Sequence, residues 1–550
     1  MRPRTAGGAR GPPPGTVWRL VVTEPELQED QHMPEAAALG GRPAPAVTEK
    51  GLRSGALGMV SSMVIGMSST APAYSIAATL GLIVLAGTGF KAAAFVLLSF
   101  VPVLFVAFAF RELNSAEPDC GTNFTWATRA FGAHAGWFTG WVVTVAQLLV
   151  MSSQSALTGR YTLLLFGASD VAENRWVTTA IGAAWLLALC WLCHRGIEVS
   201  ARAQWMLLGV ELAVLVLFSV VALVRVFDGT AGPQASVPRL DWLWPGGVGV
   251  GTAVSAVLLA VFIYWGWESS LSVNEESADP RHAPGRAAVL STVLLVLNYL
   301  LVTVAALAFA GVGSDGVGLG NEANSDDVLA GLGGAVFGDG TTGKVLGVLL
   351  IVSVLTSGAA TSQATIMPAA RTTLSMASHG ALPRVFGRVH PRFRTPSVAT
   401  WAFGLVSLAV YVLLALVSDN VLSDSVDAVG LTIAIEYTMT ALACVWVFRR
   451  TLFASVRNFL LRGLLPFVGG VFFLAVLVLA LVEYARPDAG ETTVFGVGGV
   501  AVIGVVSIVL GVPLMFAVHR ACREFFAGRR LPRGLVPRGG DVIVTRDPVG

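Results

Sequence analysis

The sequence predicts an all-α integral membrane protein with about twelve transmembrane helices. Hydrophobic residues make up 54% of the 550 residues and charged residues only 13%, and the mean hydropathy is +0.71. Soluble domains carry about 25% charged residues, so we expect most of this chain to lie in a lipid bilayer. The apolar residues also gather into stretches of about 20, the length that an α-helix needs to cross a membrane.

Twelve such apolar stretches follow one another along the chain. They lie at residues 56–83, 92–111, 136–159, 176–194, 199–225, 249–272, 288–312, 344–368, 397–417, 427–447, 464–483 and 494–518. We expect a twelve-helix domain over residues 51–520. Residues 1–50 are rich in Pro, Gly, Ala and charge without a signal peptide's apolar core, and residues 521–550 are rich in Arg and Gly. Both segments are expected to be loose tails.

The loops alternate in positive charge. Loops after even-numbered helices hold fifteen Lys and Arg residues, and loops after odd-numbered helices hold seven. Because cytoplasmic loops carry the excess of Lys and Arg, this pattern predicts a protein of the cytoplasmic membrane with both termini in the cytoplasm.

The first apolar stretch is interrupted. Its polar run ends in a proline, and we expect exposed backbone N–H groups near Met67, Ser68, Ser69 and Thr70, at the ends of two half-helices, which suit a carboxylate. A simple proline kink, relieved by Ser or Thr, is the alternative. The run is Gly66, Met67, Ser68, Ser69, Thr70, Ala71 and Pro72.

The sixth stretch is interrupted as well. Gly266 is expected to let the backbone unwind, while Tyr264, Trp265 and Trp267 line a pocket and backbone carbonyls suit an ammonium group. The three aromatics lie too deep in the span for an interfacial aromatic belt. A break survives in lipid only where protein or a water-filled cavity covers it. Two broken helices at corresponding places in two halves indicate the substrate site of a secondary transporter.

Three acidic residues fall inside membrane spans, namely Glu211, Glu268 and Glu436. A charge at mid-bilayer costs roughly 2.5–3.5 kcal/mol on insertion scales, so each acid needs a partner or a function. Glu211, near the middle of its helix, is the candidate for binding and releasing a proton, with a structural hydrogen bond as the alternative. We expect Glu268 to stabilise the sixth-helix break, and the role of Glu436 stays open between structure and gating.

Other chemistry finds little support. Cys190-Trp-Leu-Cys-His194 matches a haem-attachment pattern, but it ends a helix on the predicted cytoplasmic side and has no second copy. No metal-ligand spacing, phosphate loop or nucleophile–base pair appears. We therefore expect no cofactor, no bound metal, no catalytic residue and no nucleic-acid partner, and we do not expect an enzyme. The Gly132, Gly136 and Gly140 ladder is assigned to close helix packing.

Three stretches resemble the amino acid–polyamine–organocation (APC) permeases. Tyr264-Trp-Gly-Trp-Glu268 is similar to the family's aromatic-x-Gly-aromatic-Glu signature. The run from Arg371 to Pro383, with His390-Pro and Thr395-Pro396, resembles the family's loop after helix 8. Cys120-Gly-Thr-Asn through Gly140-Trp141 resembles the start of helix 3.

The resemblance implies a fold with two inverted repeats of five helices, discontinuous helices 1 and 6, and two added helices. It also implies that an amino acid binds between the two breaks. The chain departs from the family where Gly66-Met-Ser replaces a frequent Gly-x-Gly, and where Glu211 falls near a Lys that some proton-coupled relatives place in helix 5.

The predicted function is therefore a secondary active amino acid permease, with the proton as the coupling ion and alternating access as its mechanism. Amino acid exchange is the alternative mechanism, and transport of polyamines or other amines is the alternative substrate class. A membrane sensor that kept the fold without transport is the alternative of a different class, but it would need a signalling domain.

Overall fold

The computed structural model describes residues 48–325, 327–338, 340–417, 424, 427–490 and 492–534. The expected N-terminal tail up to residue 47 and the last residues, 535–550, lie outside this described part. The longer helices are α1 (Met59–Ser69), α2 (Pro72–Ile83), α3 (Ala92–Ala116), α4 (Asn123–Phe131), α5 (Ala133–Leu165), α7 (Arg175–His194), α8 (Ile197–Phe227), α9 (Val250–Phe262), α11 (Ala283–Ala310), α12 (Val328–Phe337), α13 (Thr341–Ser378), α14 (Ser397–Val417), α16 (Val429–Phe448), α18 (Leu465–Tyr484), α19 (Gly499–Val509) and α20 (Gly511–His519).

The short elements are α6 (Ser169–Ala172), α10 (Ser269–Ser272), α17 (Val456–Asn458), α21 (Arg523–Phe526), and the strand pair β1 (Thr493–Val494) and β2 (Val497–Gly498). In the described residues, ten stretches are long and apolar enough to cross a membrane. The first of them, Met59–Ala116, contains two crossings, α1–α2 and α3, and the interrupted pair α9–α10 supplies a further segment. The expectation of about twelve transmembrane segments is confirmed.

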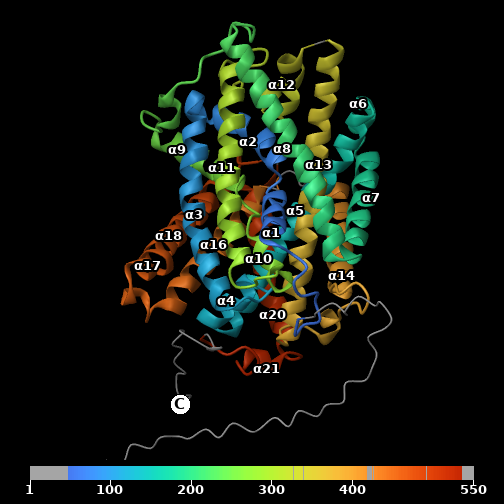
Figure 1. Ribbon diagram of the computed structural model, residues 1–550, viewed down its shortest axis with the longest axis vertical. Coiled ribbons are helices and arrows are strands. Elements are labelled where there is room, and N and C mark those ends of the chain that lie inside the picture. The colour runs from blue at the N-terminus through green and yellow to red at the C-terminus, as the bar shows by residue number, and fades with distance from the viewer. Residues whose placement is uncertain are drawn as a thin grey trace, which may run out of the picture. The chain divides into compact units, whose positions relative to one another are not determined.

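The first five membrane segments and the next five make corresponding helix contacts with each other. Helix α3 packs on α11, and α5 packs on α13. Helix α8 contacts α11 and α13, just as α16 contacts α3 and α5. Helix α4 follows the second segment and α12 follows the seventh, and the two lie at opposite ends of the bundle (Figure 1). This is an inverted repeat, as the resemblance implied, with α18 and α19–α20 added.

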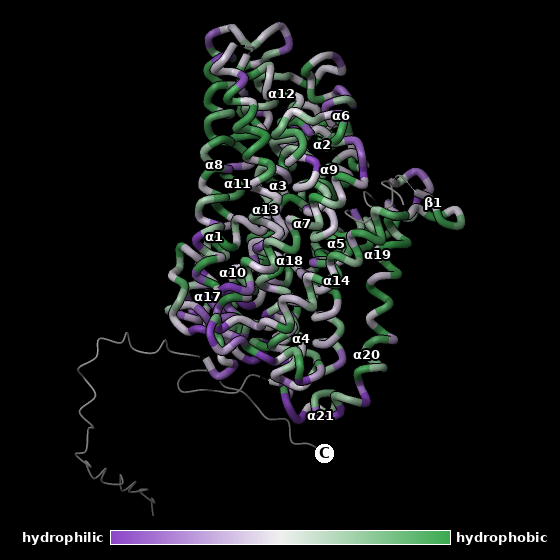
Figure 2. Tube along the Cα trace, turned by 90° about the vertical axis from the view of Figure 1, so that its right-hand side faces the viewer, coloured by the Kyte–Doolittle hydropathy of each residue, from purple (hydrophilic) through white to green (hydrophobic). Residues whose placement is uncertain are grey.

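The surface of the bundle is apolar between two polar ends. Large hydrophobic side chains such as Leu413, Val482 and Val506 are each about 60% exposed, at 62%, 62% and 59%. Figure 2 shows hydrophobic residues along the helices and hydrophilic ones gathered at their ends. Because water penalises so much exposed apolar area, the chain is a multi-pass membrane protein.

The eighth segment corrects one prediction. Helix α13 continues to Ser378, ten residues beyond the expected end at 368, so Arg371 lies inside a helix and not in a loop. The guanidinium of Arg371 is buried, and its Nε donates to the carboxylate of Glu276. That partner lies 95 residues away in the sequence. The residues around Arg371 therefore give no sign that its charge is buried in a helix.

The tail beyond residue 520 is also not loose where it is described. Phe525 and Leu531 are buried in a cluster with Phe124 and Trp137, and Arg533 Nη2 donates to the carbonyl of Phe131 at 2.7 Å. The glycine ladder makes close contacts as expected, because a Cβ on Gly136 would overlap Thr128 of α4.

The segment before α1, residues 48–58, lies against the α4 end of the bundle, and we call it the strap. Lys50 Nζ donates to Asp119 Oδ2 at 2.7 Å and to Glu275 Oε1 at 2.6 Å. Burial alone would lower the pKa of Lys50, but Asp119 and its other acidic neighbours hold that pKa well above its usual range. Burial would likewise raise the pKa of Asp119, but Lys50 and His379 hold it well below its usual range.

Replacing Asp119 with Asn is expected to destabilise the fold by about 3 kcal/mol, because Lys50 keeps only one of its two carboxylates while remaining buried. Since the pKa of Asp119 is depressed in the folded protein, its stabilisation is present at neutral pH and is lost as the pH falls through that folded-state pKa. Thermal unfolding in detergent measures the effect. The matched control is Asp241→Asn, which breaks an exposed pair with Arg239. Equal melting temperatures for the two variants would contradict the prediction.

Candidate functional site

The break in the first segment separates α1 from α2 at Thr70 and Ala71. Ala71 takes a left-handed conformation with φ of 47°, and the N–H groups of Thr70 and Ala71 close the last turn of α1 on the carbonyls of Met67 and Ser68. Because a helix C-terminus leaves carbonyls free and not amides, the prediction of free N–H groups from Met67 to Thr70 is wrong. The free amides belong to the start of α2.

One of those amides already has a carboxylate. The N–H of Ala73 donates to Glu211 Oε1 at 2.7 Å, and Glu211 is fully buried. A carboxylate at this place accepts a hydrogen bond from an N–H that has no partner within the helix. Its negative charge is also stabilised by the positive end of the α2 dipole. Glu211 therefore reaches from α8 to the break in the first segment.

The break in the sixth segment runs from Ile263 to Glu268, between α9 and α10. Gly266 has a φ of 117°, a conformation open to glycine at little cost. Tyr299 donates its hydroxyl to the carbonyl of Ile263 at 2.8 Å. Glu268 Oε2 accepts from the N–H of Gly266 at 3.2 Å and from the hydroxyl of Tyr437 at 2.9 Å. Glu268 thus holds the unwound backbone together.

The two breaks touch each other backbone to backbone. A Cβ on Gly66 would lie 2.7 Å from the carbonyl oxygen of Trp267, and a Cβ on Gly266 would lie 2.6 Å from the carbonyl oxygen of Ser69. The hydroxyls of Ser69 and Ser269 are hydrogen-bonded at 2.9 Å. Each glycine therefore provides the space for the other helix's backbone.

The aromatic residues of the sixth segment divide into two groups. Trp265 lines a cavity, and its Nε1 donates to Glu436 Oε2 at 3.3 Å. Tyr264 and Trp267 are fully buried against α3, where Tyr264 donates to the carbonyl of Val96 at 2.9 Å and the ring centroid of Trp267 lies 5.1 Å from that of Phe110. The prediction that these two line a pocket is corrected: they anchor the break to its neighbours.

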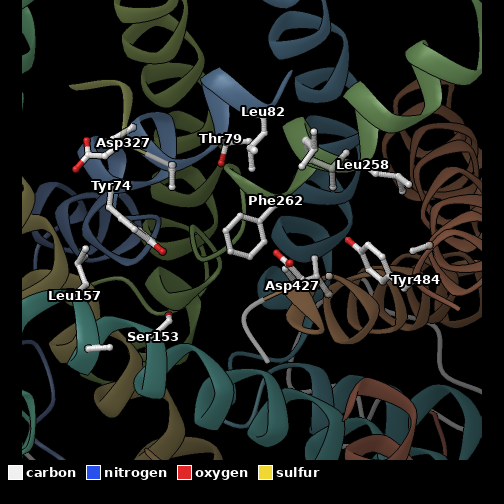
Figure 3. A pocket seen from close by; sticks show the side chains of 18 of the residues that line it. Tyr74, Thr79, Leu82, Ser153, Leu157, Leu258, Phe262, Asp327, Asp427 and Tyr484 are labelled. Carbon is white, nitrogen blue, oxygen red and sulfur yellow. The ribbon is translucent and has the colours of Figure 1, made fainter. Parts of the chain in front are cut away.

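Two cavities flank the breaks. The large cavity, of about 510 Å³, lies toward the α12 end, and Tyr74, Ser153, Leu157 and Phe262 surround it in Figure 3. The small cavity, of about 20 Å³, is lined by residues of both breaks and of α5, α13 and α16. Its lining residues are Ser69, Thr122, Asn123, Val143, Gln147, Trp265, Glu268, Ser269, Ser272, Thr365, Pro368, Thr372 and Glu436.

Several of these residues escaped the sequence analysis. Phe262 is the last residue of α9 and faces the large cavity, but in the sequence it looks like the end of an apolar run. Asn123 and Tyr437 hold the acidic groups Glu436 and Glu268 from 313 and 169 residues away. A polar residue inside an apolar stretch, as at Gln147, was the signal that could have pointed to the small cavity.

Among the described residues, one group of potential metal ligands comes together. Asp119, Cys120 and Glu275 place their ligand atoms within 4.8 Å of one another, but the ammonium of Lys50 lies among them. Cys190 and Cys193 of the haem-like pattern are buried free thiols in the helix packing. In the first group the ammonium of Lys50 lies between the carboxylates, where a metal ion would have to bind.

Comparison with known proteins gives consistent matches. A family model described as amino acid permease matches residues 55–517. The branched-chain amino acid permease BcaP of Bacillus subtilis is 27% identical over 353 residues, covering 60% of this chain and 69% of that protein. The Asc-type amino acid transporter 1 of Mus musculus is 26% identical over 415 residues, covering 74% and 70%. The methylthioribose transporter of Bacillus subtilis is 21% identical over 320 residues, covering 55% and 63%.

Gly266→Ala is expected to reduce solute flux at least tenfold, because the new Cβ would push against the Ser69 carbonyl in a backbone conformation that alanine disfavours. Flux of labelled solute into proteoliposomes measures the effect at matched protein density. Gly209→Ala is the control, since it lies in helix α8 with nothing within 4 Å of the added Cβ. Equal flux for both variants would show that the contact between the breaks is not needed.

Proposed function

Because the chain belongs to the amino acid permease family, we propose that this amino acid transporter is a proton-coupled symporter that works by alternating access. The observation that carries the proposal is the reciprocal contact of the two breaks at Gly66 and Gly266. Irregular backbone at membrane depth is costly unless it serves a cavity or a binding site. Two such segments in contact make a site that opens when they separate.

The contacts that close each side support alternating access. The large cavity extends from the α12 end to Tyr74 and Phe262, next to the two breaks, and the hydrogen bond between Ser69 and Ser269 joins the breaks. On the α4 side, the strap is held by the ion pairs of Lys50. Opening toward the α4 end requires α1 to leave Trp267 and the strap to release Asp119 and Glu275.

The solute's two main-chain charges fit the two breaks. Its carboxylate would meet the N-terminus of α2, where the helix dipole is positive. Its ammonium would meet the carbonyls and acids of the sixth-segment break. We assign this binding to the region of Gly66, Ser69, Trp265 and Gly266, with Met67, Ser68 and Thr70 shaping the end of α1.

Glu211 is the proposed coupling group. Its carboxyl holds the Ala73 N–H, has no cationic partner among its described contacts, and keeps its second oxygen without a hydrogen bond. Protonation would remove the negative charge that Glu211 places at the positive end of the α2 dipole. It would thereby change how strongly Glu211 and the solute's carboxylate compete for this helix end. This gives a physical route from a proton to solute affinity.

The test is uptake of a panel of labelled amino acids into proteoliposomes, with and without an inward proton gradient. Gradient-driven accumulation supports symport. Uptake that needs amino acid inside the vesicles would make the protein an exchanger. Flux of amines alone would favour amine transport, and no flux with any solute would favour a sensor.

Glu211→Gln is expected to flatten the pH dependence of uptake, because glutamine can still accept the Ala73 N–H but cannot bind or release a proton. Initial rates between about pH 5 and 8 measure the profile. Glu322→Gln, at an exposed residue near the α12 end, is the control. An unchanged pH profile in Glu211→Gln would remove this residue from the coupling role.

We also propose that the protein spans the cytoplasmic membrane with its α4 end facing the cytoplasm, so that both termini are cytoplasmic. All five native cysteines are buried, which leaves the surface free for labelling. A cysteine at Val385 should react with an impermeant maleimide only after cells are opened, whereas one at Val237, exposed near the other end, should react in intact cells. The reverse result would invert the topology.

A further inference from the structure

The chain between α16 and α18, residues 449–464, carries positive charge alone, and we call it the α16–α18 connection. Its sequence contains no Asp, Glu or Lys, and its arginines are Arg449, Arg450, Arg457 and Arg462. Figure 1 shows its helix α17 at the outer edge of the bundle, beside α18 and toward the α4 end. Cations at such a place face either water or lipid headgroups, and the neighbouring side chains decide between the two.

Three guanidinium groups converge on one buried carboxylate. Glu112, which is 2% exposed near the end of α3, accepts on Oε1 from Arg111 Nη2 at 2.9 Å and from Arg457 Nη2 at 3.0 Å. Arg462 Nε donates to the other oxygen, Oε2, at 2.7 Å. We call these three arginines the arginine cluster. Because one carboxylate balances only one of the three charges, the cluster is attractive to a further anion.

The arginine cluster keeps donors for that anion. A guanidinium carries five N–H groups in a planar fork that matches the oxygens of a phosphate. The side chain of Arg457 is 59% exposed although it also reaches Glu112. Arg462 lies over the ring of Phe448, 4.5 Å from its centroid, and so holds the cluster against the end of α16. The guanidinium of Arg457 is therefore fixed at one side and open at the other.

The apolar side chains of the α16–α18 connection indicate lipid and not water around it. Phe453 and Val456 are 85% and 76% exposed, and Phe453 stacks on Phe459 with ring centroids 5.8 Å apart. Exposed apolar surface of this kind marks an interaction site or a membrane contact. Arginines combined with exposed Phe and Val are typical of a segment that lies in the membrane interface, with its apolar side chains at the acyl boundary. The anion available at that depth is a lipid phosphate.

We propose that Arg111, Arg457 and Arg462 bind the phosphate of an anionic phospholipid in the leaflet at the α4 end, while Phe453 and Val456 insert among its acyl chains. Basic pockets between membrane helices select anionic headgroups. A zwitterionic lipid fits less well, because it brings its own cation to a cluster that already has an excess of positive charge. The bound lipid would join α3 to the α16–α18 connection. This site is separate from the two breaks and does not depend on the proposed transport function.

The experiment counts lipids bound to the purified, delipidated full-length protein by native mass spectrometry. The probes are dioleoyl phosphatidylglycerol and dioleoyl phosphatidylcholine, which have the same acyl chains. The unmodified protein should bind the first phosphatidylglycerol about tenfold more tightly than the first phosphatidylcholine. Arg457→Gln should reduce this preference about fivefold, and the fold should be retained because Glu112 keeps Arg111 and Arg462. The matched control, Arg384→Gln, removes an exposed charge at the same end and should leave the preference unchanged.

Two results with the variants would overturn the proposal. An unchanged preference in Arg457→Gln would show that the arginine cluster does not hold the headgroup. An equal loss of preference in Arg457→Gln and Arg384→Gln would show that the net charge of this end attracts the lipid without a site.

The unmodified protein gives a further measurement that does not depend on a variant's folding. Inorganic phosphate at the same concentration as the lipid should not displace phosphatidylglycerol, because the phosphate lacks the acyl chains that contact Phe453 and Val456. Displacement would assign the arginine cluster to a free anion and overturn the lipid proposal. Equal affinity for phosphatidylglycerol and phosphatidylcholine would overturn it as well, because the site would then not select a headgroup.

Discussion

The structure depends on one constraint: an unwound helix inside a membrane must find partners for its backbone within the protein. Here the two broken segments pack against each other backbone to backbone. Gly66 admits the carbonyl of Trp267, and Gly266 admits the carbonyl of Ser69. Side chains from the surrounding helices complete the set, with Thr361 donating to the Ser68 carbonyl at 2.7 Å and Tyr299 to that of Ile263 at 2.8 Å. The helices around the breaks hold these contacts in place.

Much of the fold could be predicted from the sequence, because length and hydropathy decide where a helix crosses a membrane. The positions of the crossings and of both breaks are confirmed, and the APC resemblance gave the inverted repeat. Partner identity could not be predicted. Arg371 can lie inside a helix because Glu276 accepts from it, and the orientation of Tyr264 and Trp267 depends on contacts with α3. No local sequence pattern reveals these distant partners.

The positions of the two breaks could be predicted, but not which polar groups they present. A stretch with Ser, Thr and Pro signals a break, yet only the dihedral angle of Ala71 shows that α1 ends in carbonyls and that the free amides start α2. The three membrane acids look equivalent in the sequence. In the structure Glu211 holds the end of α2, whereas Glu268 and Glu436 converge on one cavity from helices that are distant in the chain.

The docked segment after α20 has a consequence for biosynthesis. Phe525 and Leu531 fill a cluster that includes Phe124, from the helix before the third membrane crossing, and Trp137, from that crossing. Phe124 and Trp137 are synthesised about four hundred residues before Phe525. Until Phe525 and Leu531 are made, this face of the α4 end lacks two of the apolar side chains that cover it in the folded protein, so its packing is completed only after the membrane segments have been synthesised.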